Sequence, residues 1–210
     1  MCSRPRAEKL FFEGKNIENI PSYKAASLGI ARTFQNLQVF KNMTVIENVM
    51  VGAHLHTRSN MLTAALSLPG KQKEERKLYD VAMEYLHFVG LEHLCDYLSS
   101  DLPLGALRLL ELARALAVKP KLLLLDEIAA GLNHKETKEM ASLIERIRDR
   151  GVTVLVVEHD MDLVMGICDK VVVLDQGVKI AEGTPKEVQN NEQVINAYLG
   201  ADIDDIKEGE

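Results

Sequence analysis

Three runs of mainly aliphatic residues in the C-terminal half of the chain place the strongest constraint on its fold. They lie at 121–125, 152–157 and 171–174 and are rich in leucine and valine. Continuous runs of this length indicate strands buried on both faces, as in a parallel sheet covered by helices. The segments between them, 135–150 and 160–168, have helical patterns. The order strand, helix, strand, helix, strand predicts an α/β domain built on a parallel sheet.

Turn and cap residues add further elements to this prediction. The Gln-Gly pair at 176–177 predicts a turn into a short strand over 178–181. Asn133, with a glutamate three residues later, predicts the N-cap of the helix that follows the first strand. Thr184, followed by a proline and then a glutamate, predicts the start of a last helix that ends near Gly200.

The middle third of the chain has helical patterns over 43–57 and 74–118. We expect a helical subdomain inserted between an early strand, at about 9–12, and the α/β core. The predicted parts are a partial N-terminal strand region with the loop that follows it at 1–35, the helical subdomain at 36–118, the α/β core at 119–182, and a C-terminal helix with an acidic tail at 183–210.

Composition limits the classes of function. The chain has 25 Lys and Arg against 31 Asp and Glu, a net charge of −6, and its sequence has no basic stripe, which argues against a nucleic-acid role. Its three cysteines, Cys2, Cys95 and Cys168, are odd in number and widely spaced, which favours a reducing compartment over a disulfide framework. No apolar run approaches the roughly 18–20 residues needed to span a bilayer. We therefore expect a cytoplasmic protein.

Acidic residues and a histidine follow two of the predicted strands. Asp126 and Glu127 come directly after the first strand, and Glu158 and His159 come after the second. Ligands bind beyond the carboxyl ends of strands in open α/β sheets, so these side chains are candidates for a site. Four leucines followed by Asp-Glu match the Walker B pattern of P-loop ATPases, in which the aspartate holds phosphate-bound Mg²⁺. The alternatives are an acidic loop or helix cap for Asp-Glu, and a structural role for His159.

Short motifs in a fixed order carry a resemblance to a known family. The chain from about 10 to 200 resembles the ATP-binding subunit of an ABC transporter, and it is most similar to the group that drives branched-chain amino acid importers. The matching motifs are a Q-loop at 29–35, the sequence MTVIEN at 43–48, Walker B at 122–127, a D-loop at 129–133, an H-loop at 158–161 and an ending at 191–200. The resemblance implies a partial P-loop NTPase core of the ABC ATPase type, α/β in class, with a parallel sheet and an inserted helical subdomain.

The resemblance also implies a role for each matching position. Gln35 would contact Mg²⁺ and the attacking water, and Asp126 would hold Mg²⁺ through water. Glu127 would be the general base for hydrolysis, and His159 would hold the γ-phosphate. The signature loop at 102–106 would cap ATP bound on the opposite subunit. The implied nucleotide-contacting residues of this loop and the D-loop are Leu102, Pro103, Gly105 and Asn133.

The cofactors implied by the resemblance are ATP and Mg²⁺. The implied partners are transmembrane permease subunits and a second ATP-binding subunit, with no nucleic acid. Gln35 would also couple the site to the membrane subunits. The chain would act as an ATP-hydrolysing subunit that energises an importer, with branched-chain amino acids as cargo, and would lie peripherally at the inner face of the plasma membrane.

The sequence departs from the family pattern at several positions. No Gly-x-x-x-x-Gly-Lys-[Ser/Thr] motif occurs, so we expect the chain to begin after that phosphate-binding loop and not to bind Mg-ATP tightly alone. In the signature loop, Ala106 and Leu107 offer no side-chain hydrogen bonds to a phosphate, and Leu109 stands where the group carries arginine. Ile128 and His134 replace prolines, which is expected to loosen the turns around the D-loop.

These departures leave a second hypothesis open beside the enzyme. A degenerate relative or fragment would dock to transporter subunits without hydrolysing ATP. The retained Gln35, Glu127 and His159 favour the enzyme, whereas the missing phosphate-binding loop and Ala106 favour the non-catalytic relative. A third hypothesis, an ABC ATPase that works on DNA or ribosomes, is disfavoured by the acidic balance.

Overall fold

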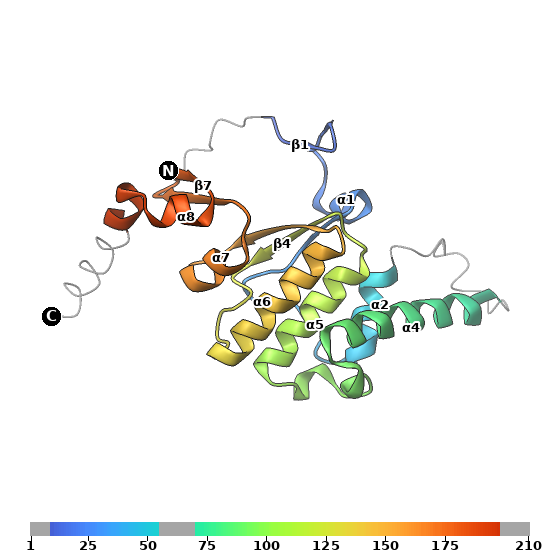
Figure 1. Cartoon of the computed structure of the whole chain (residues 1–210). Helices are drawn as coiled ribbons and strands as arrows, with labels where there is room; N and C mark the ends of the chain where they lie inside the picture. Colours follow the sequence, from blue (N-terminus) through green and yellow to red (C-terminus); the bar gives the residue numbers. More distant parts are fainter. Residues whose placement is uncertain (1–8, 55–69, 198–210) are drawn as a thin grey trace, which may run out of the picture. The chain divides into compact units, whose positions relative to one another are not determined.

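The computed structural model describes residues 9–54 and 70–197 (Figure 1). The chain divides into two compact units, Met1–Leu124 and Leu125–Glu210. The four-part division expected from the sequence stays a prediction. None of the helices in the described residues is both long enough and apolar enough to span a membrane.

Three helices form the core of the first unit: α2 (Val45–Ala53), α4 (Gly70–Val89) and α5 (Leu104–Ala117). They pack against one another, and Figure 1 shows them as adjacent ribbons. Gly52 of α2 permits a close approach to α5, because a β-carbon there would lie 2.2 Å from the carbonyl oxygen of Arg114. The fully buried aliphatic side chains of this core include Val45, Val49, Leu86, Leu110 and Leu112.

Shorter elements precede and separate these helices. They are β1 (Phe11–Phe12), β2 (Lys15–Asn16), α1 (Ser22–Ala25), β3 (Ile30–Arg32) and three 3₁₀ turns, η1 (Ala26–Leu28), η3 (Glu92–Leu94) and η4 (Ser99–Asp101). The helical patterns expected over 43–57 and 74–118 are confirmed for the described residues, except that η3 and η4 interrupt the second. The early strand expected at 9–12 is limited to β1, which pairs antiparallel with β2.

Asn48 of α2 organises the loops at the edge of the helical core. Its side chain is fully buried and accepts a hydrogen bond from the Phe40 amide at 2.9 Å. It donates to the Thr44 carbonyl at 3.0 Å and to Ser99 Oγ at 2.8 Å. Thr44 caps α2 in a reciprocal capping box with Glu47. The MTVIEN motif therefore has a structural explanation, because its polar residues start α2 and fix the neighbouring loops.

The division between the two units falls within β4 (Leu122–Asp126), and each unit pairs its own part of this strand. In the first unit, β3 pairs in parallel with β4, with Ile30 opposite Leu122. In the second unit, the Glu127 amide after β4 donates to the Val157 carbonyl at the end of β5 (Thr153–Val157).

Among its described residues, the second unit contains three complete helices, a further helical stretch at 192–197 and a β-hairpin. The helices are α6 (His134–Asp149), α7 (Met161–Ile167) and α8 (Pro185–Gln189), and the hairpin strands are β6 (Val171–Asp175) and β7 (Val178–Gly183). α6 packs on β5 and α7. A separate apolar cluster joins α7, β6, β7, α8 and the helical stretch at 192–197, and it comprises Val164, Val171, Ala181, Val188 and Val194. The last predicted helix is interrupted, because α8 ends at Gln189 and residues 192–197 are helical again. Its expected end at Gly200 lies outside the described residues.

The third apolar run was expected to add a third core strand in parallel, and this expectation is wrong for the described residues. β6 pairs antiparallel with β7 instead. The two-residue turn between them explains the pairing. Gln176 has φ 45° and Gly177 has φ 80°, and two successive positive φ values belong to a turn type that favours a tight hairpin.

Burial on both faces was also expected for all three runs, but even β4 has one buried face and one half-buried face. Leu123 and Leu125 are buried, but Leu155 and Val157 of β5 are about half exposed. Val172 and Leu174 of β6 are likewise exposed. An aliphatic run indicates that a strand tends to be buried, but burial also requires other elements that cover the strand. The described residues do not cover both faces of β5 and β6.

Replacement of Asn48 by alanine should destabilise the first unit by about 2–4 kcal/mol, because it removes several buried hydrogen bonds and leaves their backbone partners unsatisfied. Urea denaturation of the Asn48→Ala chain, monitored by circular dichroism, measures the loss. Asn36→Ala, at an exposed position in the same unit, serves as the control and should change stability by less than about 0.5 kcal/mol. Equal stabilities for the two variants would contradict the role of Asn48.

Candidate functional site

The carboxyl ends of β4 and β5 lie side by side in the second unit. The Glu127 amide donates to the Val157 carbonyl at 2.9 Å, and the Ala129 amide donates to Glu158 Oε1 at 2.9 Å. These two bonds hold the turn after β4 against the end of β5. They bring the strand-end residues Asp126, Glu127, Glu158 and His159 to one edge of the sheet, as the sequence predicted.

Glu127 has a backbone conformation that side-chain-bearing residues rarely adopt. Its φ is 45°, in the left-handed region, where a residue with a β-carbon is strained by roughly 1–3 kcal/mol. The surrounding bonds hold it there, because its amide binds Val157 and its carbonyl accepts from the Ala130 amide at 3.1 Å. Strain of this kind concentrates at functional positions, so it supports Glu127 as a candidate.

The two neighbours of the exposed His159 in the chain fix the position of its backbone. Glu158, directly before it, is bound to the Ala129 amide, and Asp160, directly after it, caps α7 by accepting from the Leu163 amide at 3.0 Å. His159 itself is exposed at the edge of the sheet. The backbone at His159 is therefore held from both sides while its ring faces solvent.

The segment after Glu127 is anchored rather than loosened. Ile128 is fully buried, which works against the looser turn expected from the loss of a proline. Asn133 Oδ1 accepts from the Lys135 and Glu136 amides, and the Glu136 carboxylate accepts from the Asn133 amide at 2.9 Å. The predicted N-cap is confirmed. The Asn133 side-chain oxygen is thus engaged in capping α6, and the nucleotide contact implied for this residue stays a prediction.

Gln35 lies in the first unit, after β3. Thr33 is buried directly after this strand, and its amide donates to the Leu124 carbonyl at 2.9 Å. The Gln35 side chain is exposed. Its backbone carbonyl accepts a hydrogen bond from the Arg108 guanidinium of α5 at 3.2 Å. The backbone of this segment is therefore held from the buried side while the amide side chain faces outward.

The predicted signature loop also lies in the first unit, at the start of α5. Leu102 is buried, whereas Pro103 and Leu104 are exposed. Pro103 is the N-cap of α5, and no side chain caps the helix. Amides in the first turn of such a helix can bind an anion, and Gly105 lies in that turn. The altered residues Ala106, Leu107 and Leu109 are half-buried rather than fully solvent-facing.

The carboxylates present suit a magnesium ion that is partly held by phosphates. Mg²⁺ in nucleotide sites uses one or two carboxylates, with phosphate and water oxygens completing its shell. Asp126 and Glu127 are half-buried carboxylates at a strand end. Among the described residues, no group of three or more His, Cys, Asp or Glu side chains could hold a metal. The number of carboxylates in the pair matches the one or two that such an ion uses.

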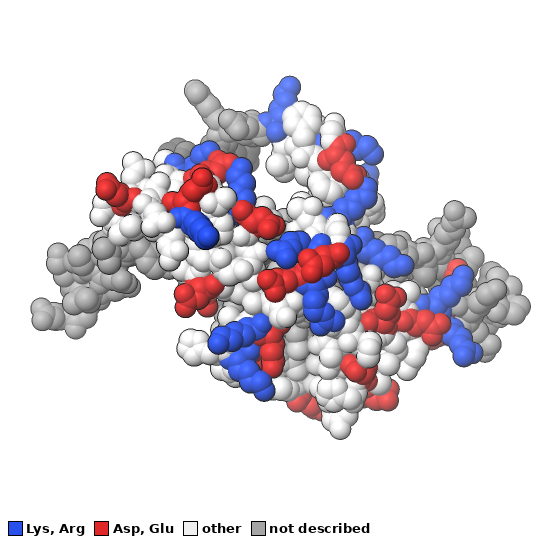
Figure 2. Space-filling view, in the orientation of Figure 1, with Lys and Arg blue, Asp and Glu red and all other residues white. Residues whose placement is uncertain are grey.

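Two sets of residues in these segments were missed by sequence reasoning. Glu158 was placed at its strand end but given no role, although an acidic residue beside a candidate histidine was a usable signal. Arg108 and Glu111 were not singled out, although two charges three residues apart on an otherwise apolar helix were visible in the sequence. On the face shown in Figure 2, basic and acidic side chains are interspersed, and no basic patch stands out there.

Two family models match parts of the chain. Residues 2–130 match a family model described as ABC transporter, and residues 178–204 match one described as branched-chain amino acid ATP-binding cassette transporter. Similar proteins include the high-affinity branched-chain amino acid transport ATP-binding proteins BraF of Pseudomonas aeruginosa and LivG of Escherichia coli. They are 41% and 39% identical over 198 residues, which is 94% of this chain and 78% of each relative.

A more distant relative and two solved structures are also similar. The lipopolysaccharide export system ATP-binding protein LptB of Haemophilus influenzae is 32% identical, over 91% of this chain and 74% of its own. A crystal structure of a nucleotide-free ATP-binding cassette from an ABC transporter superposes with a TM-score of 0.75 at 31% identity, over 90% of this chain and 76% of that one. A cassette in its ADP conformation gives the same TM-score and identity, over 91% and 76%.

Replacement of Glu158 by alanine should free the turn after β4, because the Ala129 amide loses its acceptor. We expect hydrogen exchange at the Ala129 amide to accelerate at least about tenfold, as the loss of a hydrogen bond to a charged group implies. Glu158→Gln keeps an acceptor and should change exchange less. Glu139→Ala, which breaks only an exposed pair with Lys135 on α6, is the control. Unchanged exchange in Glu158→Ala would contradict the anchoring role.

Proposed function

The chain belongs to the ABC transporter family, and on that premise we propose that it is the ATP-hydrolysing subunit of an importer whose cargo is branched-chain amino acids. The match of residues 178–204 to the branched-chain amino acid family model carries the cargo assignment. That segment lies outside the catalytic motifs, so it reports on the kind of transporter rather than on ATP chemistry. Overall sequence identity does not distinguish one cargo from another, because the lipopolysaccharide-export relative is also 32% identical to this chain.

We propose that the strand-end residues carry the hydrolysis. Mg²⁺ neutralises phosphate charge when it is bound, and Asp126 would hold it through water. Glu127, beside it, would accept a proton from the attacking water. His159, held at its backbone by its neighbours, would donate a hydrogen bond to the γ-phosphate. The support for these assignments is that Glu127, Glu158 and the strand ends are bonded into one edge of the sheet.

The first unit would supply the remaining contacts. Gln35 would position the attacking water and respond to the membrane subunits. The amides of the first turn of α5, at Gly105 and its neighbours, would face a phosphate of a nucleotide on a second ATP-binding subunit. The proposed partners are therefore that second subunit and transmembrane permease subunits, at the inner face of the plasma membrane.

The ATPase assignment is tested with the chain assembled in its transporter. Glu127→Gln should lower the rate of ATP hydrolysis at least about 100-fold, because a general base of this kind contributes about 10²–10⁴-fold. Glu139→Gln makes the same chemical change at an exposed position of α6 and should leave turnover unchanged. Unchanged turnover in Glu127→Gln would remove this residue as the base. No turnover in the unsubstituted assembly would favour a subunit that docks without hydrolysing ATP.

The cargo assignment is tested separately, by uptake of radiolabelled amino acids into cells. Deletion of the gene should abolish high-affinity uptake of leucine, isoleucine and valine and leave uptake of glutamate unchanged. Reintroduction of the unsubstituted gene should restore uptake, whereas the Glu127→Gln gene should not. Normal uptake of all three branched-chain amino acids in the deleted strain, with no second transporter for them present, would contradict the assignment.

A further inference from the structure

Three charged residues lie on one face of the otherwise largely apolar helix α5. Arg108, Glu111 and Arg114 are spaced by three residues, which places them along one side of the helix. Arg108 is only 4% exposed and Glu111 only 2%. Charges buried to this extent are costly unless they are paired and hydrogen-bonded, so their presence in a helical core requires a reason.

The contacts of these residues converge on the segment at 34–35. Glu111 Oε1 accepts a hydrogen bond from the Phe34 amide at 3.2 Å. The Arg108 guanidinium donates to the Phe34 carbonyl at 3.4 Å and to the Gln35 carbonyl at 3.2 Å. The two side chains also pair with each other at 3.7 Å. Two side chains of α5 therefore bind one amide and two carbonyls of the segment that carries Gln35.

The same helix face contacts the chain farther along this segment. Burial raises the pKa of Glu111, and hydrogen bonds from the backbone amides of Phe34 and Gln38 oppose that shift. The Arg114 guanidinium lies over the Phe40 ring, 5.5 Å from its centroid. The charged face of α5 thus follows residues 34–40 along their length.

The buried pair is not arranged for stability alone. Arg108 Nε and Glu111 Oε2 are buried, and neither makes a hydrogen bond to another described residue. A buried ion pair with unsatisfied atoms contributes little net stability, and an apolar pair of similar size is often as stable. What the pair adds is a defined position for the backbone that it binds.

We propose that Arg108 and Glu111 are positioning residues that hold the Gln35 segment against α5. They bind its backbone, while Gln35 itself is exposed. α5 begins at Leu104, next to the predicted signature loop. A displacement of the start of α5 would therefore be passed to Gln35 through this pair. The inference rests on the proposed function, which takes Gln35 as the residue that meets Mg²⁺ and the attacking water.

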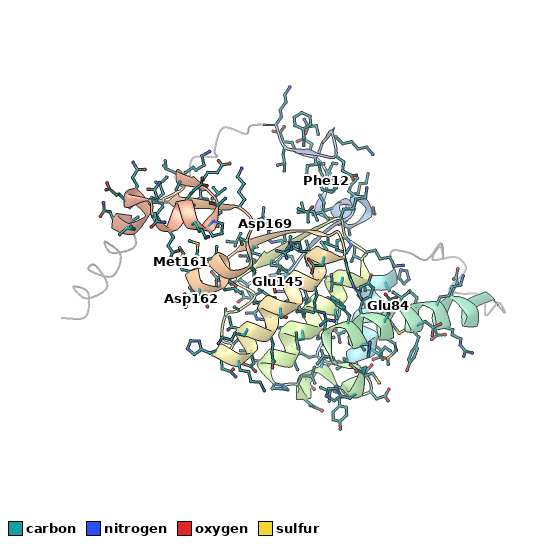
Figure 3. All side chains as sticks on the ribbon, in the orientation of Figure 1. Phe12, Glu84, Glu145, Met161, Asp162 and Asp169 are labelled. Carbon is teal, nitrogen blue, oxygen red and sulfur yellow. The ribbon has the colours of Figure 1, made fainter. Side chains whose placement is uncertain are left out.

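The attachment of residues 34–35 to Arg108 and Glu111 is tested by amide hydrogen exchange of the chain, without nucleotide. In Glu111→Leu, the Phe34 amide should exchange at least about tenfold faster, because it loses a buried charged acceptor. Amides within α2 should be unchanged, which establishes that the helical core stays folded. Glu84→Leu is the control, since Glu84 is exposed on α4 of the same unit (Figure 3). A change below about twofold at Phe34 would overturn the proposal.

Milder variants keep the test decisive if Glu111→Leu unfolds the core. Glu111→Gln retains one acceptor but loses the charge. Arg108→Lys keeps the charge but loses the planar fork whose two terminal nitrogens bind the Phe34 and Gln35 carbonyls separately. Both should accelerate exchange at residues 34–38 while α2 stays protected. Protection equal to that of the unsubstituted chain in both variants would overturn the proposal.

The consequence for catalysis is tested in the assembled transporter by steady-state kinetics. Glu111→Gln should lower kcat by about tenfold to a hundredfold, because a small misplacement of a positioned group costs this much. KM for ATP should stay within about twofold. Because a smaller folded fraction would also lower the apparent kcat at unchanged KM, kcat is expressed per folded, assembled subunit, and Glu84→Gln, at an exposed position of α4, should leave it unchanged. Unchanged kcat would overturn the positioning role. The exchange result needs no ATP, so it stands or fails independently of whether the chain hydrolyses ATP.

Discussion

The burial of β4 is the constraint on which the candidate site depends. Leu123 and Leu125 are buried, whereas Leu122, Leu124 and Asp126 are only half-buried. A slip of one residue along this strand would exchange the two sets and drive the Asp126 carboxylate into the apolar layer. Burial of an unpaired carboxylate costs several kcal/mol, so the leucines fix the register. The same register sets where Asp126 and Glu127 emerge from the sheet.

From this fixed strand, local polar bonds set the positions of the candidate catalytic groups. Glu158 binds the turn that follows Glu127, and Asp160 starts α7 directly after His159. Asn133 starts α6 at the end of the D-loop. Several motif positions thus have a structural role beside any chemical one. Capping and anchoring residues hold the backbone, and the residues next to them, Glu127 and His159, are left at the edge of the sheet.

Much of the fold could be predicted because its signals are local. Runs of leucine and valine located β4 and β5, and Thr44, Asn133 and Thr184 started helices at the expected places. The pairing of β6 could not be predicted from its composition, because an aliphatic strand suits a parallel sheet and a hairpin equally. The turn at Gln176 and Gly177 decided the pairing through its backbone conformation.

The candidate site was predictable to a similar degree. The strand ends identified Asp126, Glu127 and His159, because parallel strands deliver their carboxyl ends to one edge. The role of Glu158 could not be predicted, since its bond to the Ala129 amide depends on the path of a turn. The pair of Arg108 and Glu111 depends on a contact across more than 70 residues of sequence, between α5 and the segment after β3. The two charges on an apolar helix are visible in the sequence, but neither segment shows which partner they bind.

The central claim is that the ends of β4 and β5 form a magnesium-nucleotide site, and paramagnetic nuclear magnetic resonance tests it most directly. Mn²⁺ replaces Mg²⁺ in ATP complexes and broadens nearby amide signals, even when binding is weak. With millimolar Mn²⁺-ATP, we predict broadening of the amides from Asp126 to Ala130 and at His159, and loss of that broadening in Asp126→Ala. Sharp signals at all of these amides, or equal broadening in Asp126→Ala, would contradict the claim.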